Sequence, residues 1–144
     1  MNTWESNSDG LKATAIREAG HALANLYFGI SFTEVRIFDD ESGHVSVDTP
    51  EPRNITEAEP FTICRFAGYA AEHVVLKCEP RITEQDWQVI WEFVRPLFRK
   101  EHRFEQFTAR MERRAVKLMR LRRGTIVWLA DALVERRRLT RVRL

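Results

Sequence analysis

The chain has 144 residues, of which 44% are hydrophobic and 31% are charged, and its formal net charge is +2. This apolar content suits one globular domain with a single core and excludes an intrinsically disordered chain. No run approaches the roughly 18 apolar residues of a membrane span, and residues 1–10 are too polar for a secretion signal. We expect one cytoplasmic domain over residues 1–144, with residues 1–9 flexible.

Hydrophobic spacing predicts a first helix over residues 10–28. Apolar residues recur near helical spacing from Leu11 to Leu26, and either Ser8 or Asp9 could cap the start. Gly29 supplies a plausible stop.

Two short segments of alternating apolar and polar residues follow this helix. Val35 and Ile37 belong to the first, and Val45 and Val47 belong to the second, on either side of residues 39–43. The pattern predicts two strands and a connecting turn. Because a two-stranded ribbon is at best marginally stable alone, we expect it to pack on a helix.

Two later helices are predicted from their start signals. Thr56 and Thr83 each begin a capping-box pattern, with an acid three residues later, followed by an apolar helical stripe. The predicted helices cover residues 57–76 and 84–95, and Pro96 should kink or restart the second.

Helical spacing continues over residues 104–118 and again over residues 126–133, as two helices or as one bent helix. We see no internal repeat and no change of composition that would mark a second domain. The predicted fold is therefore α+β and mainly α-helical, with a small two- or three-stranded β-ribbon.

The two cysteines, Cys64 and Cys78, are not predicted to form a disulfide or a cysteine zinc site. On one helix their separation would be about 21 Å, too far for a disulfide. They also lack C-x-x-C spacing. Cys64 lies on an apolar stripe, which favours an unreactive core thiol over a catalytic nucleophile.

Positive charge is concentrated at the end of the chain, where residues 109–144 hold 12 Lys or Arg against 3 Asp or Glu. Such asymmetry suggests an acidic partner, which would be nucleic acid, a membrane surface or another protein. The densest cluster comprises Arg136, Arg137, Arg138, Arg141 and Arg143. In the competing interpretation, the solvated face of an amphipathic helix accounts for Arg113, Arg114, Lys117 and Arg120.

The chemistry concentrates within the first helix, in Arg17-Glu18-Ala19-Gly20-His21. In the H-E-x-x-H zinc motif, two histidines four residues apart lie on one helix face, and the glutamate is the general base for zinc-bound water. Here Glu18 and His21 match the glutamate and the second histidine, and Arg17 stands at the first histidine. Alone, this short string is unspecific, and Glu18 and His21 could be ordinary helix residues.

Further segments lie in the order found in one family, and together with this motif the chain resembles the peptidase domain of the FtsH family of ATP-dependent zinc metalloproteases. The family pattern at the zinc helix is H-E-A-G-H-A. The resemblance implies that Asp86 matches the third zinc ligand. The matching segments are Ala15–Leu23, Glu34–Ile37, Ser42–Val45, Ala67–Val75, Arg81–Val94 and Ile126–Leu139.

This sequence departs from the family at two points. It contains no G-x-x-x-x-G-K-[ST] phosphate loop, so no ATPase module is expected. Arg17 cannot ligate zinc, because a guanidinium stays protonated and has no lone pair for a metal. His21 and Asp86 alone fall short of the roughly three protein ligands of a catalytic site.

Three hypotheses follow for the site, on Arg17, on Asp86 and on zinc. Arg17 could replace the metal by pairing with Glu18 and Asp86, the alternative being that it points to solvent. Asp86 could instead serve only as the capping acid of Thr83. Zinc would be retained only if His44 or His73 supplied a compensating ligand.

The preferred interpretation is a pseudopeptidase that has lost metal binding and catalysis and binds a protein or peptide, with no cofactor. An edge of the ribbon around Val45 and Val47 would pair with an extended segment. One alternative is an active zinc metallopeptidase with a substituted ligand. Another is a scaffold that binds an acidic partner or nucleic acid through its basic C-terminal segment. A homo-oligomer is compatible with each.

Overall fold

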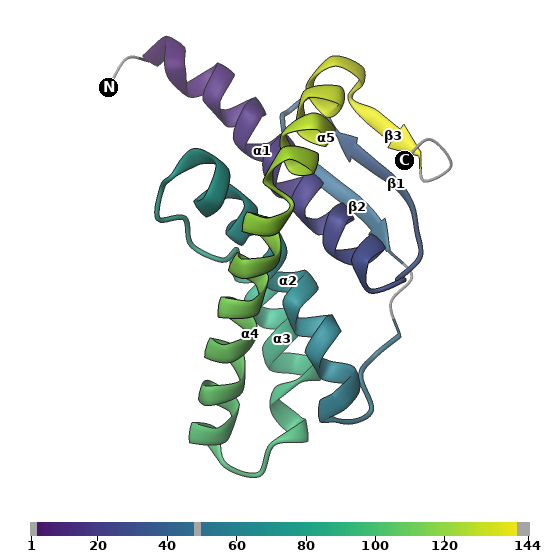
Figure 1. The fold of residues 1–144 in the computed structure, drawn as a ribbon, viewed down its shortest axis with the longest axis vertical. Helices are drawn as coiled ribbons and strands as arrows, with labels where there is room; N and C mark the ends of the chain where they lie inside the picture. The colour runs from purple at the N-terminus through teal and green to yellow at the C-terminus, as the bar shows by residue number, and fades with distance from the viewer. Residues whose placement is uncertain (1–2, 48–49, 141–144) are drawn as a thin grey trace.

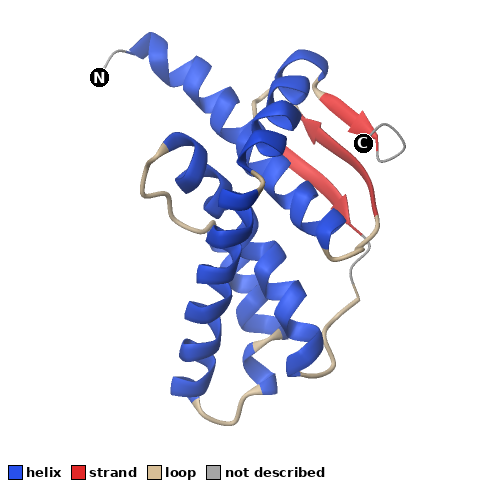
Figure 2. Cartoon of the chain, in the orientation of Figure 1, coloured by secondary structure: helices blue, strands red, loops and turns tan. Residues whose placement is uncertain are grey.

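The computed structural model describes residues 3–47 and 50–140 and has an α+β, mainly helical fold (Figures 1 and 2). A three-stranded sheet lies at one end against α1, and α2, α3 and α4 form the other end (Figure 1). The helices are α1 (Thr3–Tyr27), α2 (Ile55–Leu76), α3 (Glu84–Phe93), the short 3-10 helix η1 (Arg95–Leu97), α4 (Glu101–Leu121) and α5 (Arg123–Arg136). The strands are β1 (Phe32–Ile37), β2 (Gly43–Val47) and β3 (Arg138–Thr140).

The sheet is antiparallel, in the order β2-β1-β3. The predicted pair is β1 and β2, with Val35 opposite Val45, and the third strand comes from the end of the chain, with Leu139 also opposite Val35. Three residues are too short for alternation to reveal a strand, so the sequence pattern did not locate β3. Arg137 takes a left-handed conformation (φ 64) that ends α5. β2 is left at an outer edge of the sheet.

Helix α1 is longer at its start than predicted. It begins at Thr3 rather than near Gly10, so neither Ser8 nor Asp9 caps it, and it ends at Tyr27, with Gly29 at a φ of +68. A positive φ is a conformation that glycine adopts without strain, which explains the stop. The flexibility expected for residues 1–9 stays a prediction, and residues 1 and 2 lie outside the described part of the chain.

The two predicted helix starts have different outcomes. Thr83 caps α3 as expected, since its hydroxyl accepts the Asp86 N–H at 3.1 Å. Asn54, not Thr56, caps α2 by accepting the Glu57 N–H at 2.9 Å. Asn and Thr are both good caps, so the sequence did not decide between them. The end of the chain contains two separate helices, α4 and α5, which meet at Arg122.

The core is densest where α1 packs on α2. A Cβ added at Gly20 would lie 2.6 Å from the Ala71 Cβ, and one added at Gly68 would collide with the His21 ring and lie 2.7 Å from the Arg17 Cγ. Glycine at these positions lets the helices approach closely and holds Arg17 and His21 against α2. Cys64 is buried in this region, which raises the pKa of its thiol to about 12, whereas Cys78 is exposed.

Among the described residues, no helix has both the length and the apolar character needed to cross a membrane. This agrees with the absence of a long apolar run from the sequence.

Gly68→Ala should lower the free energy of unfolding by about 1–3 kcal/mol, because the new methyl group overpacks the interface against His21 and Arg17. Gly124→Ala is the matched control, since a Cβ there meets nothing within 4 Å and the residue lies in α5. It should leave stability unchanged or raise it by up to about 1 kcal/mol. Urea unfolding measures both, and equal effects would refute the close approach.

Candidate functional site

A cleft of about 330 Å³ lies between α1, β2, α2 and the start of α3. Five residues that the sequence singled out line it, although they come from three distant segments: Arg17, Glu18, His21, His44 and Asp86. His73 is elsewhere. The structure therefore places most of the predicted site residues in one cleft, and it adds a charged residue that the sequence analysis did not single out, Arg65.

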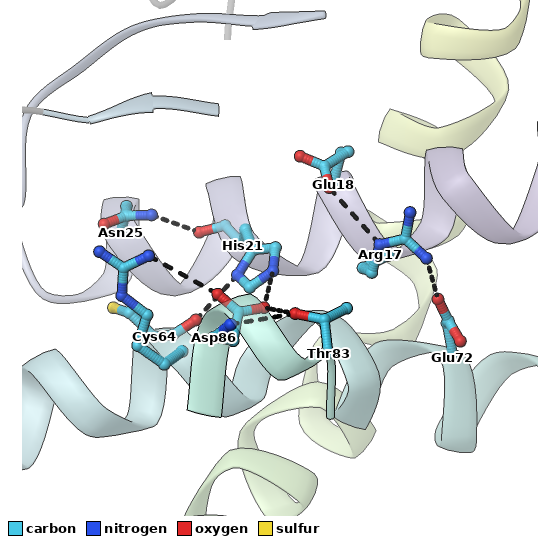
Figure 3. Close-up of polar contacts among 9 residues, drawn as sticks. Arg17, Glu18, His21, Asn25, Cys64, Glu72, Thr83 and Asp86 are labelled. Atoms are coloured by element: carbon cyan, nitrogen blue, oxygen red, sulfur yellow. Dashed lines mark hydrogen bonds and ion pairs between the residues drawn. The ribbon is translucent and has the colours of Figure 1, made fainter. Parts of the chain in front are cut away.

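His21 has a fixed orientation in the cleft. Its Nδ1 lies 2.8 Å from the Cys64 carbonyl oxygen, so this nitrogen donates and Nε2 is turned toward Asp86, 3.7 Å from Oδ2 (Figure 3). Metal-binding histidines are commonly oriented by such a donor bond from the second ring nitrogen. His21 thus has the surroundings of a ligand.

Asp86 is held by the start of α3 and by the guanidinium of Arg65. The Thr83 hydroxyl lies 2.9 Å from Oδ2 and also accepts the Asp86 N–H, so the capping role predicted for this acid is real. Its Oδ1 lies 3.6 Å from Arg65 Nη1. Asp86 therefore combines a contact with the Thr83 cap and a place in the cleft, and its match to a zinc-ligand position stays a prediction.

Arg17 points to neither Asp86 nor open solvent. Its Nη1 donates to Glu72 Oε1 at 3.0 Å, and its Nε lies 3.7 Å from Glu18 Oε1 (Figure 3). The expected pairing of Arg17 with Glu18 is confirmed and that with Asp86 is wrong, while the replacement of a metal by this pairing stays a hypothesis. The sequence missed Glu72 as the main partner, because its position one helix away depends on the glycine contact between α1 and α2.

Arg65 supplies the positive charge that Arg17 does not give to Asp86. Its guanidinium also lies over the Phe61 ring, 5.4 Å from the centroid, which favours a cation. The sequence held a signal for this residue. Arg65 is the only charged residue between Phe61 and Ala71, in the most buried stretch of α2.

Glu18 and Glu72 are acids in poorly hydrated surroundings. The Glu18 side chain is only 7% exposed, and a Cβ added at Gly43 of β2 would collide with it. Burial raises the pKa of both carboxyl groups, and the nearby charge of Arg17 partly opposes this rise. Arg17 is thus needed beside Glu18 and Glu72, because burying a carboxylate without a partner costs free energy.

The cleft does not fit a catalytic zinc ion. Arg17 stands where the H-E-x-x-H motif has its first histidine, and a guanidinium has no lone pair for a metal. Of the two compensating candidates, His44 lines the cleft, but His73 lies outside it, with Nδ1 2.7 Å from the Cys78 carbonyl oxygen. Over residues 3–47 and 50–140, no three His, Cys, Asp or Glu side chains are grouped to hold a metal ion.

The basic C-terminal cluster is partly committed to the fold. Arg138 lies with its Nε 2.6 Å from Glu34 Oε2, across the β1–β3 pair, and Arg137 ends α5. Arg141 and Arg143 lie outside the described residues.

No protein-family model matches the chain, and no curated protein matches it. The function is therefore inferred from the geometry of the cleft and from the sequence motifs.

A double-mutant cycle of Arg17→Met and Glu72→Gln should give a coupling energy of about 1–2 kcal/mol, since Glu72 is largely buried and Arg17 is partly solvated. Urea unfolding of the four proteins measures it. Arg53→Met and Glu57→Gln form the control cycle, because this pair at the start of α2 is more exposed and should couple much more weakly. Equal coupling in both cycles would mean that the Arg17 pair is merely a surface contact.

Proposed function

We propose that this domain is a pseudopeptidase related to the FtsH peptidase domain, which binds an extended protein segment at the cleft and does not hydrolyse it. The observation that carries the proposal is Arg17, which stands at the first ligand position and is held there by Glu72 and Glu18. The relationship is supported by the meeting of Glu18, His21 and Asp86 in one cleft.

Hydrolysis would require an activated nucleophile, and none of the residues lining the cleft is one or can activate one. Glu18 retains the position of a general base, but that role depends on a metal-bound water, which needs a third ligand. Cys64 also lines the cleft, but burial raises the pKa of its thiol to about 12, far from a reactive thiolate.

Binding is supported by the position of β2. This strand lies at the sheet edge, and its residues Gly43, His44 and Val45 line the cleft. An edge strand presents backbone N–H and C=O groups to which an extended segment can add as a further strand. Side chains of that segment would then reach Arg65 and His21 in the cleft.

Zinc retention should increase from the wild-type protein to Arg17→His and again to Arg17→His/Arg65→Met. The first change adds a ligand, and the second frees Asp86 from its guanidinium partner. Metal analysis after gel filtration and the visible spectrum of Co²⁺-loaded protein measure the increase. Arg17→Met/Arg65→Met is the control, which removes both charges without adding a ligand. One zinc per wild-type chain would favour an active peptidase with a substitute ligand such as His44.

Peptides selected for binding to the wild-type protein should protect the backbone amides of residues 43–47 from hydrogen exchange, because they would pair with the free edge of β2. Hydrogen-exchange mass spectrometry measures this protection, and intact-mass analysis should find the peptides uncut. β3, at the opposite sheet edge, serves as the internal control. Protection of β3 or of the helices, with β2 unchanged, would contradict strand addition.

A further inference from the structure

Helix α4 carries a stripe of five exposed basic residues along its solvent face, which the cleft does not use. They are Arg103, Arg110, Arg113, Lys117 and Arg120. At 3.6 residues per turn they fall within an arc of about 100° and extend over about 26 Å. Figure 1 shows α4 at the edge of the molecule.

The charges of this basic stripe are not neutralised within the fold. In the part of the chain that the structure describes, no carboxylate pairs with any of the five, and the only α4 cation in an ion pair is Arg114, which lies beside the stripe and contacts Glu59. The helix's own acids, Glu101, Glu105 and Glu112, cluster about 60° or more away around the axis. Neighbouring stripe residues three or four apart repel one another, so the helix carries like charges that it does not compensate.

The composition of the stripe indicates the kind of partner. Along the stripe, the exposed large apolar side chain among the described residues is Leu121 at the end of α4, whereas a protein interface usually has an apolar centre and a membrane surface binds several inserted apolar groups. Exposed aromatics are also lacking there, and these are what stack the bases of single strands. Four of the five residues are arginines, whose forked donors fit phosphate oxygens.

We propose that the basic stripe of α4 binds the phosphate backbone of double-stranded nucleic acid without reading its sequence. The duplex carries phosphates along the whole length of about 26 Å that the stripe spans, so a helix lying along the backbone can contact them with all five side chains. The other polar side chains within the arc are those of His102 and Gln106. A helix that lies along the phosphates keeps its arginines away from the base edges, so it has little means of distinguishing bases. This surface is separate from the cleft, and the proposal stands whether or not the cleft binds peptides.

Fluorescence anisotropy with labelled mixed-sequence DNA and RNA duplexes tests the proposal on the whole chain. Five phosphate contacts predict a slope of roughly −4.5 for log affinity against log salt, or about a 500-fold loss between 50 and 200 mM salt. Arg113→Gln/Lys117→Gln should make the slope less steep by about 1.8. Lys12→Gln/Arg53→Gln removes the same charge from exposed positions off the stripe and should leave the slope unchanged.

Circular dichroism should show that both double variants are folded, since all four residues are exposed. An equal loss of affinity in the two variants would overturn the proposal, because binding would then follow net charge alone. So would the absence of duplex binding at 50 mM salt, tighter binding to a single strand of the same length, or binding to phosphatidylserine vesicles with none to the duplexes.

Discussion

The close packing of α1 on α2 determines the arrangement of the cleft. Gly20 and Gly68 leave no room for a side chain between the two helices, so Arg17 and His21, one turn apart on α1, are pressed against α2. At that distance Arg17 reaches Glu72, and the His21 ring reaches the Cys64 carbonyl. The close approach of the two helix backbones therefore determines which polar groups come within contact distance. The charge pairs then form between those groups.

Two guanidinium groups stand among the acids in and beside the cleft. Glu18 and Asp86 line the cleft, Glu72 lies beside it, and Arg17 and Arg65 supply two positive charges against these three acids. Two guanidiniums can neutralise carboxylates and donate hydrogen bonds, but they cannot accept the lone pair of a water molecule. Ion pairs of this kind can thus hold the shape of the cleft without a metal, whereas metal-assisted activation of water needs one.

Sequence patterns identified the features that depend on local chemistry. The helix stop at Gly29, the cap at Thr83 and the pairing of β1 with β2 all come from short-range signals. The order of motifs also placed Glu18, His21 and Asp86 together. The Arg17–Glu72 pair joins side chains 55 residues apart and depends on how closely two helices pack, which residue types alone do not specify.

β3 and Arg65 show two other limits of the sequence. A three-residue strand has no room for alternation, and its pairing with β1 depends on the left-handed turn at Arg137, a residue type that rarely adopts this conformation. Arg65 was visible as the single charge in a buried helical segment. It lacked a predicted partner, because Asp86 had been assigned to Arg17.

The cations of the cleft and those of α4 differ in what surrounds them. Arg17 and Arg65 lie within reach of buried acids, so the fold itself accounts for their charge. The stripe from Arg103 to Arg120 has no such acids, and its mutual repulsion is tolerated because the opposite face of α4 buries Phe104, Phe107 and Met111 in the core. A helix anchored in this way can keep a uniformly positive face in water. That face is neutralised only by salt or by a partner that brings its own negative charge.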